Sequence, residues 1–401
     1  MSRSRTAAYG ARPTTVLRAP GLDWILLLAV AALLTFGSLL VWSATSTRDD
    51  LTGGDPTAYL QKQLVNVAIG VVLMVMVLAT DHRWVRILAP LVYVASIGGL
   101  VLVLTSGSTI NGSRSWLQLG GMSIQPAEFA KLAVVIGMAL LVAERAEGRR
   151  RHDVNWVDVT GMLVIAGIPA ALIMMQPDLG TMLVLSATVF GVIAASGASR
   201  RWLVLLVAGG VSAGVAAVSA GLLKQYQVDR FLAFTNPDLD PRGAGYNTEQ
   251  ARIAVGNGGL FGEGLFGGSQ TRSGFVPEQH TDFIFTVAGE ELGLVGATVL
   301  IALLCVVIWR ALSIAANTDD VFGRIAAAGI ACWFGFQAFQ NVGMCLGIMP
   351  VTGVPLPFVS YGGSSMFAGM LALGLLQNIH LRSSTALPTR LLDTSRVLTR
   401  R

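Results

Sequence analysis

One short stretch, Val276 to Glu291, concentrates titratable side chains between long apolar segments. These side chains belong to Glu278, His280, Asp282, Glu290 and Glu291. Asp282 precedes the apolar sequence FIF, and a carboxyl group held against apolar side chains has a raised pKa. A raised pKa lets a carboxylate act as a general base near neutral pH. We therefore expect a polar site with Asp282 as its base. The simpler alternatives are a loop that faces water and a helix cap, a position that Asp favours.

Three other polar segments interrupt the apolar runs: Asn111 to Trp116, Gln125 to Lys131, and Gln176 to Thr181. Lys131 needs an anion, because an unpaired charge near hydrocarbon loses its hydration. The nearest candidates are Glu128, about one helical turn away, and Asp178. We expect a Lys131–Asp178 ion pair. Such a pair either staples two helices or takes part in chemistry, and the residues leave both readings open.

Arg114, in the sequence NGSRSW, is a candidate for binding phosphate because its guanidinium offers a planar fork of donors. A surface ion pair is the alternative. Asp238 and Asp240 resemble the acidic pair that holds a metal in many nucleotide-sugar transferases. So short a pattern also arises by chance.

The elements that position these residues are membrane helices. The chain of 401 residues is 53% hydrophobic and 13% charged, about half the charge of a soluble domain. Its apolar runs are continuous and long enough to cross about 30 Å of hydrocarbon, which excludes a β-barrel. We predict an all-α polytopic protein with ten spans: Trp24–Val41, Leu64–Ala79, Ile87–Leu104, Phe129–Ala143, Val157–Met175, Thr181–Ala195, Leu203–Leu223, Leu292–Trp309, Ile325–Leu346 and Met366–Ile379.

Basic residues set the expected orientation, because Lys and Arg collect on the cytoplasmic side. The run Arg149 to Arg151 and the arginines of both termini predict that both ends are cytoplasmic and that the polar segments face outside. We expect cytoplasmic tails at 1–20 and 382–401 and a ten-helix domain at 21–381. One large extracellular loop, 224–291, separates the seventh and eighth spans. The positive charge does not indicate nucleic-acid binding.

Four sequences resemble the signatures of the shape, elongation, division and sporulation (SEDS) family: PEQHTDFIF, QPAEFAK, QPDLGT and NVGMCLGIMPVTGVPLPFVSYGGSS. The first and last are more similar to the rod-shape members, RodA, than to the division members, FtsW. The resemblance implies a ten-helix fold in the bacterial cytoplasmic membrane. It also implies a peptidoglycan glycosyltransferase that polymerises lipid II, with a class B penicillin-binding protein as its cross-linking partner.

The resemblance maps the family's essential aspartate onto Asp282 and its Lys–Asp pair onto Lys131 and Asp178. Asp282 would deprotonate the 4-hydroxyl of lipid II as it attacks the anomeric carbon of a glycan linked to undecaprenyl pyrophosphate, with inversion. Arg114, Arg272 or a divalent cation, Mg²⁺ or Mn²⁺, would stabilise the leaving group. The remaining expected substrate-binding residues are Glu128, Glu278, His280, Ser360 and Tyr361.

Two other classes of function are open. A lipid II flippase would also use intramembrane charges such as Lys131 and Asp178, although no internal repeat is apparent. A scaffold that only recruits the cross-linking enzyme would not require Asp282. A division role of the FtsW type is the alternative to elongation.

Overall fold

The computed structural model describes residues 21–110, 113–119, 122–147, 154–221, 227–228, 230, 234, 240 and 243–385. Ten long helices dominate this part of the chain, and every expected span overlaps one of them. They are α1 (Trp24–Ser46), α3 (Ala58–Ala79), α4 (His82–Ser106), α5 (Pro126–Glu147), α6 (Trp156–Met175), α7 (Leu179–Ala195), α8 (Arg200–Ser219), α12 (Ile284–Ala316), α13 (Val321–Cys345) and α14 (Gly363–Thr385). The prediction of an all-α membrane protein is confirmed.

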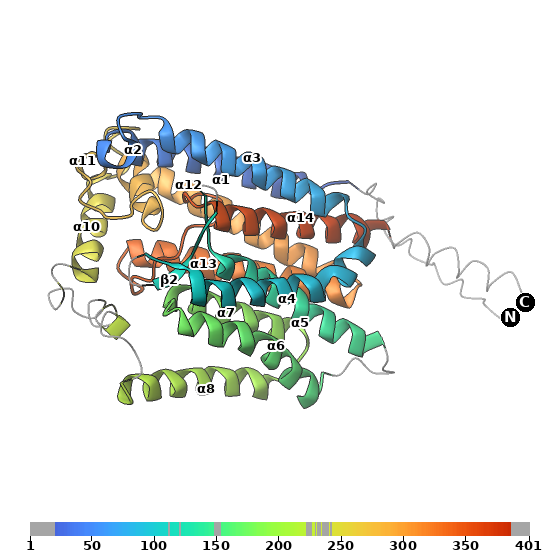
Figure 1. Cartoon of the computed structure of the whole chain (residues 1–401). Coiled ribbons are helices and arrows are strands. Elements are labelled where there is room, and N and C mark those ends of the chain that lie inside the picture. Colours follow the sequence, from blue (N-terminus) through green and yellow to red (C-terminus); the bar gives the residue numbers. More distant parts are fainter. Residues whose placement is uncertain are drawn as a thin grey trace, which may run out of the picture.

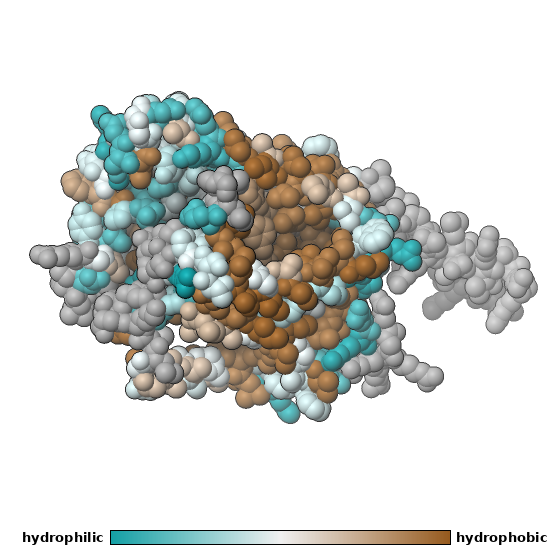
Figure 2. Space-filling view, in the orientation of Figure 1, coloured by the Kyte–Doolittle hydropathy of each residue, from teal (hydrophilic) through white to brown (hydrophobic). Residues whose placement is uncertain are grey.

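Eight helices in the described ranges are long and apolar enough to cross a membrane; α7, with 17 residues, and α14 are not among them. The count of ten crossings therefore stays a prediction. Figure 2 shows apolar side chains over the middle of the helices and hydrophilic ones toward both ends. The expected tails at 1–20 and from 386 onward lie outside the described residues, and α14 continues to Thr385, past the expected boundary at 382.

Acidic residues begin several of these helices. Asp23 accepts a hydrogen bond from the backbone N–H of Leu26, and Asp320 accepts one from Gly323. Asn155 and Asp158 form a reciprocal capping box at α6. The first turn of a helix has N–H groups without intrahelical partners, and a side-chain oxygen satisfies them. The helices therefore begin where the apolar runs meet such a residue.

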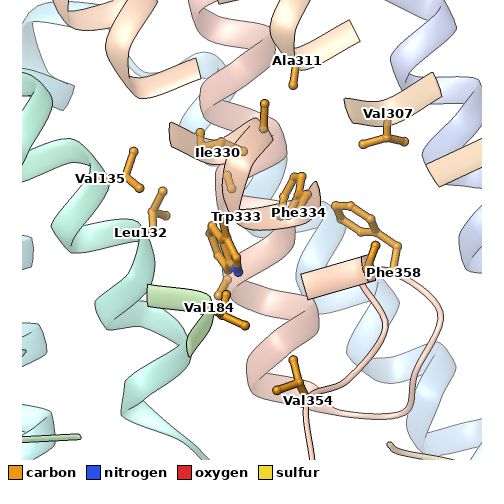
Figure 3. Packing of buried hydrophobic residues seen from close by; sticks show 14 of the residues in the cluster. Leu132, Val135, Val184, Val307, Ala311, Ile330, Trp333, Phe334, Val354 and Phe358 are labelled. Atoms are coloured by element: carbon orange, nitrogen blue, oxygen red, sulfur yellow. The ribbon is translucent and has the colours of Figure 1, made fainter. Parts of the chain in front are cut away.

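Helix α13 lies at the centre of the bundle, with α5, α7 and α12 packed around it, while α3 packs on α14 (Figure 1). Its buried Trp333 and Phe334 anchor the core shown in Figure 3. The Phe334 ring meets Phe358 edge to face, with centroids 5.1 Å apart. Phe358 lies in the segment 346–362 between α13 and α14, so this Pro- and Gly-rich segment folds back onto the bundle.

Three connections between the long helices carry structure of their own. The segment between α4 and α5 forms a three-stranded antiparallel sheet of β1 (Ser108–Ile110), β2 (Ser113–Leu119) and β3 (Met122–Ile124), which the apolar pattern did not predict. The short helix α2 (Asp49–Thr52) follows α1. The large loop before α12 contains α10 (Ala244–Asn257) and α11 (Ser269–Ser273).

Helix α12 starts eight residues before the expected span and is interrupted at Gly293, which has φ 65° and ψ −167°. The chain at 259–264 fills the interruption. Gly259 and Leu260 accept hydrogen bonds from the N–H groups of Leu294 and Val295, at 2.9 and 3.1 Å. Glycine is required at 293 because a Cβ there would collide with the inserted backbone.

Candidate active site

A cavity of about 190 Å³ opens at the end of the bundle where the large loop and the sheet lie. Six separate parts of the chain line it. Strand β2 contributes Ser113, Ser115 and Trp116, and the α6–α7 turn contributes Pro177 to Leu179. The other lining residues are Gln125, Arg230, Glu278, Thr281, Asp282, Thr352, Gly353, Pro355, Tyr361, Gly362, Ser364 and Ser365. All four of the expected polar segments and the C-terminal motif therefore meet around one space.

Asp282 lies on the wall of this cavity, half-buried, two residues before α12. Its N–H donates to the Glu278 carbonyl at 3.0 Å, and its carbonyl accepts from Nδ2 of Asn341 on α13 at 2.7 Å. Burial raises the pKa of its carboxyl group to about 7, and the charges of Glu278 and Asp178 add to the rise while Arg230 opposes it. Half of such carboxyl groups are ionised at neutral pH, which suits a general base.

Glu278 is exposed, lines the same cavity and holds the left-handed backbone conformation, with φ 48°. Its carbonyl accepts hydrogen bonds from the N–H groups of Thr281, Asp282 and Phe283, which closes the turn that leads into α12. Its negative charge raises the pKa of Asp282. The structure therefore gives Glu278 a position from which it tunes the neighbouring carboxyl group.

His280 is buried behind the cavity rather than on its wall. Its ring meets the Tyr59 ring edge-on at 4.9 Å and lies 5.7 Å from the ring of Tyr361, which lines the cavity. The N–H of Tyr361 donates to the His280 carbonyl at 3.0 Å. Burial lowers the pKa of His280, which keeps the ring neutral at pH 7. This residue ties the segment of Asp282 to the C-terminal motif.

Ser360, the neighbour of Tyr361, is buried and does not line the cavity. Its hydroxyl oxygen accepts a hydrogen bond from the N–H of Leu356 at 2.8 Å, so it closes a turn in segment 346–362.

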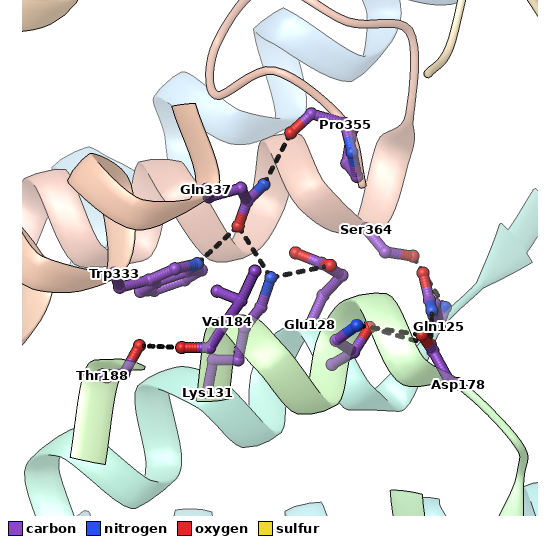
Figure 4. A network of polar contacts seen from close by, with 11 residues as sticks. Gln125, Glu128, Lys131, Asp178, Val184, Thr188, Trp333, Gln337, Pro355 and Ser364 are labelled. Carbon is purple, nitrogen blue, oxygen red and sulfur yellow. Dashed lines mark hydrogen bonds and ion pairs between the residues drawn. The ribbon is translucent and has the colours of Figure 1, made fainter. Parts of the chain in front are cut away.

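The expected ion pair between Lys131 and Asp178 is wrong. Lys131 is fully buried, and its Nζ donates to Oε1 of Glu128 at 2.8 Å and to Oε1 of Gln337 at 2.9 Å (Figure 4). The ammonium also lies 5.0 Å from the centre of the Trp333 ring. The i,i+3 spacing on α5 brings Glu128 within reach, and α13 supplies the other two partners. Lys131 and Glu128 lie in the bundle and are not lining residues of the cavity.

Asp178 has other partners. It caps α7 by accepting hydrogen bonds from the N–H and the hydroxyl of Thr181 at 2.9 and 2.8 Å. Nε2 of Gln125 donates to the same carboxylate at 3.0 Å (Figure 4). These neutral donors occupy the oxygens that the expected pair would use. Asp178 lines the cavity and faces the site together with Gln125.

Neither arginine expected to bind phosphate lines the cavity. The exposed Arg114 donates from Nε to the carbonyl of Gly107, the residue after α4, and from Nη2 to the carbonyl of Thr105 in its last turn, each at 2.8 Å. Arg272 is exposed on α11. The lining residues instead include Arg230, from the large loop, which no sequence motif indicated.

The part of the chain that the structure describes holds no group of three or more His, Cys, Asp or Glu side chains able to hold a metal ion. Asp240 caps α10 through the N–H of Ala244 at 2.7 Å, and Asp238 lies outside the described residues. Asp240 therefore acts as a helix cap among the residues described.

Sequence reasoning missed two further residues that hold Asp282. Asn341 fixes its backbone, and Gly353, with φ 69°, lies against its carboxylate. Both residues belong to the C-terminal motif, so that motif was the sequence feature that could have indicated them. Their contact with Asp282 was not visible because 59 residues separate Asn341 from Asp282.

The family model described as "Cell cycle protein", that of the FtsW, RodA and SpoVE proteins, matches residues 24–385. The chain is 37% identical over 359 residues to stage V sporulation protein E of Bacillus subtilis (strain 168). This alignment covers 89% of this chain and 96% of that protein. It is 38% identical over 362 residues to the peptidoglycan glycosyltransferase MrdB of Escherichia coli (strain K12), covering 90% and 93%.

Two solved structures are also similar. One comes from a study of the structural coordination of polymerization and crosslinking by a peptidoglycan synthase complex; its TM-score is 0.74 at 32% identity, covering 90% of this chain and 98% of that one. The other is the rod shape determining protein RodA of Thermus thermophilus, with a TM-score of 0.65 at 30% identity, covering 90% and 97%.

Proposed function

The chain belongs to the FtsW, RodA and SpoVE family and is a peptidoglycan glycosyltransferase of the membrane, and we propose that it polymerises lipid II into β-1,4-linked glycan strands. The observation that carries this proposal is Asp282, a carboxyl group of pKa about 7 on the wall of a polar cavity. The cavity lies at one end of a bundle of apolar helices, which suits a substrate with a polar head and a lipid tail.

In the proposed reaction, Asp282 takes the proton of the acceptor's 4-hydroxyl as that oxygen attacks the anomeric carbon of the donor sugar. The new C–O bond forms while the bond from the anomeric carbon to the pyrophosphate oxygen breaks. The pyrophosphate leaves with the bonding electron pair on its lipid carrier. Inversion at the anomeric carbon turns an α-linked phosphate into a β-1,4 linkage.

We assign the stabilisation of the leaving group to Arg230, because it lines the cavity with Asp282 whereas Arg114 and Arg272 do not. A guanidinium neutralises charge that develops on a pyrophosphate. Glu278, Asp178 and Tyr361 line the same space and are the proposed contacts for the sugars. We also propose that a divalent ion carried in by the substrate would neutralise the charge on the leaving pyrophosphate.

We assign the chain to elongation and the polymerising site to the outer face of the cytoplasmic membrane. The sequence PEQHTDFIF and the C-terminal motif support the elongation role, and the distribution of arginines supports the orientation. The similarity to a protein studied in a peptidoglycan synthase complex supports a class B penicillin-binding protein as partner.

The test is glycan formation from lipid II by the full chain with its cognate class B partner, comparing the wild type with Asp282→Asn. Moenomycin silences contaminating transferases of the classical type. Polymer from the wild type and at least a hundredfold less from the variant is expected, since general acid–base catalysis contributes about 10²–10⁴-fold. Equal polymer from both would move the base elsewhere. No polymer from either would favour a lipid II flippase, which a translocation assay would detect.

A further inference from the structure

The loop at 259–264 has two features that the proposed reaction does not use. It carries Leu260 and Phe261, residues that are 62% and 81% exposed, between glycines. It is also bound backbone to backbone into the interruption of α12 at Gly293.

At the interruption, two hydrogen bonds that would lie within the helix are replaced by four bonds to the loop. In an uninterrupted helix the N–H groups of Leu294 and Val295 would donate to the carbonyls of Glu290 and Glu291. Here they donate to Gly259 and Leu260 of the loop. The carbonyls of Glu290 and Glu291 accept instead from the N–H groups of Glu263 and Gly264, each at 3.0 Å. These four exchanged bonds keep the backbone of the junction paired, which is the condition for a non-helical segment at the edge of hydrocarbon.

The loop lies at the cavity end of the long half of α12. The first N–H groups of a helix point toward its N-terminus, so carbonyls that accept from Leu294 and Val295 lie beyond that end. The exposed face of the helix begins there, with Leu294 60%, Val295 51% and Val299 42% exposed. The apolar tip of the loop therefore adjoins an exposed apolar face of α12.

The uncharged part of α12 that follows Gly293 is shorter than the hydrocarbon layer. Its uncharged stretch from Leu294 to Trp309 rises about 24 Å at 1.5 Å per residue. A bilayer has about 30 Å of hydrocarbon. An apolar extension at the cavity end makes up part of the difference.

We propose that Leu260 and Phe261 form an anchor that inserts into the lipid leaflet on the cavity side and sets the depth of α12 in the membrane. Asp282 lies two residues before α12, so the same anchor sets the height of the cavity above the hydrocarbon. The occupant of this surface is a phospholipid bilayer. This inference does not depend on the reaction assigned to the cavity.

The test places a nitroxide spin label at Phe261→Cys in the full chain, reconstituted in phosphatidylcholine–phosphatidylglycerol nanodiscs without a partner protein. Cys305, Cys332 and Cys345 are replaced by alanine. A variant that keeps only the exposed Cys305 of α12 serves as the lipid reference, and Glu249→Cys, at an exposed position of α10, serves as the water reference. Collisions with oxygen and with a water-soluble nickel chelate measure the depth of each label.

The expected ratio of oxygen to nickel collisions at position 261 is several-fold higher than at 249 and approaches that at 305. Nickel collisions as frequent as those at 249 would overturn the proposal. Few collisions with either oxygen or the nickel chelate would overturn it too. That result would mean that protein, for instance a second copy of the chain, covers the tip.

Discussion

Gly353 leaves the space that the carboxylate of Asp282 occupies. A Cβ built on Gly353 would come 3.1 Å from Oδ2 of Asp282, closer than most van der Waals contacts. The two residues are 71 positions apart and belong to different connections of the bundle. The absence of a side chain at 353 is therefore part of the candidate active site.

Gly353→Ala is expected to lower the rate of glycan formation strongly while the protein still folds. Alanine presses on the base and also adopts a left-handed φ of 69°, at a cost of about 1–2 kcal/mol. Gly347→Ala is a matched control: its φ is 74°, and its Cβ would also meet a side-chain atom at 3.1 Å, that of Arg252, which is not a lining residue of the cavity. Thermal midpoints of the two variants should be similar and polymerisation rates different. Equal polymerisation rates for the two variants would mean that backbone strain, and not contact with Asp282, causes the loss.

The pH dependence of the reaction should report Asp282. A base must be ionised, so kcat/KM is expected to rise about tenfold per pH unit below a midpoint near 7 and to level above it, because the pKa of Asp282 is raised to about 7. Glu278→Gln removes a negative charge that raises this pKa, so the midpoint should move to lower pH. Arg230→Gln removes a positive charge that lowers it, so the midpoint should move to higher pH. Shifts in the same direction for both variants would contradict this assignment.

The partner of Lys131 can be identified by a double-mutant cycle. Lys131→Met leaves Glu128 as a buried charge without its cation and is expected to destabilise the fold by about 3–5 kcal/mol. Adding Glu128→Gln should restore part of that loss, whereas Asp178→Asn should add independently, because Asp178 is bound to Thr181 and Gln125. The measurement is unfolding of each variant in the same detergent. If the coupling energy between Lys131 and Asp178 is as large as that between Lys131 and Glu128, the result would support an ion pair between Lys131 and Asp178.

Glu290 is expected to hold the large loop rather than to act as a base. It is fully buried, and its carboxylate accepts from the N–H groups of Gln270 and Thr271 at 2.6 and 3.0 Å and from the Thr271 hydroxyl at 2.7 Å. Glu290→Gln should weaken these charge-assisted bonds by about 1.5–3 kcal/mol in total and speed hydrogen exchange at 269–273. The midpoint of the pH profile should stay where it is in the wild type. A displaced midpoint would make Glu290 a candidate base again.

Much of the fold was predictable because its signals are local. An apolar run of bilayer length must form a helix, since no water is present to satisfy its backbone. Asp23 and Asp320, which directly precede two of those runs, cap the N-terminal ends of the helices. Asp282 could be identified as the candidate base for the same reason, because the apolar residues beside it are its neighbours in sequence. Local patterns in the sequence thus specify the class of fold, the positions of the helices and one candidate catalytic residue.

Which residues share the site depends on how the helices pack against one another. Lys131 meets Gln337 across 206 positions. Asn341 on α13 and Gly353 in the segment between α13 and α14 contact Asp282, and Arg230 lies in the same large loop, 52 positions before it. Asp178 was predicted to pair with Lys131 because both charges lie near the membrane edge. Its carboxylate is instead occupied by a helix cap and an amide. Contacts of this kind depend on the rotation and the height of each helix against its neighbours. Those two quantities follow from the packing of the whole bundle, and no single segment of the sequence encodes them.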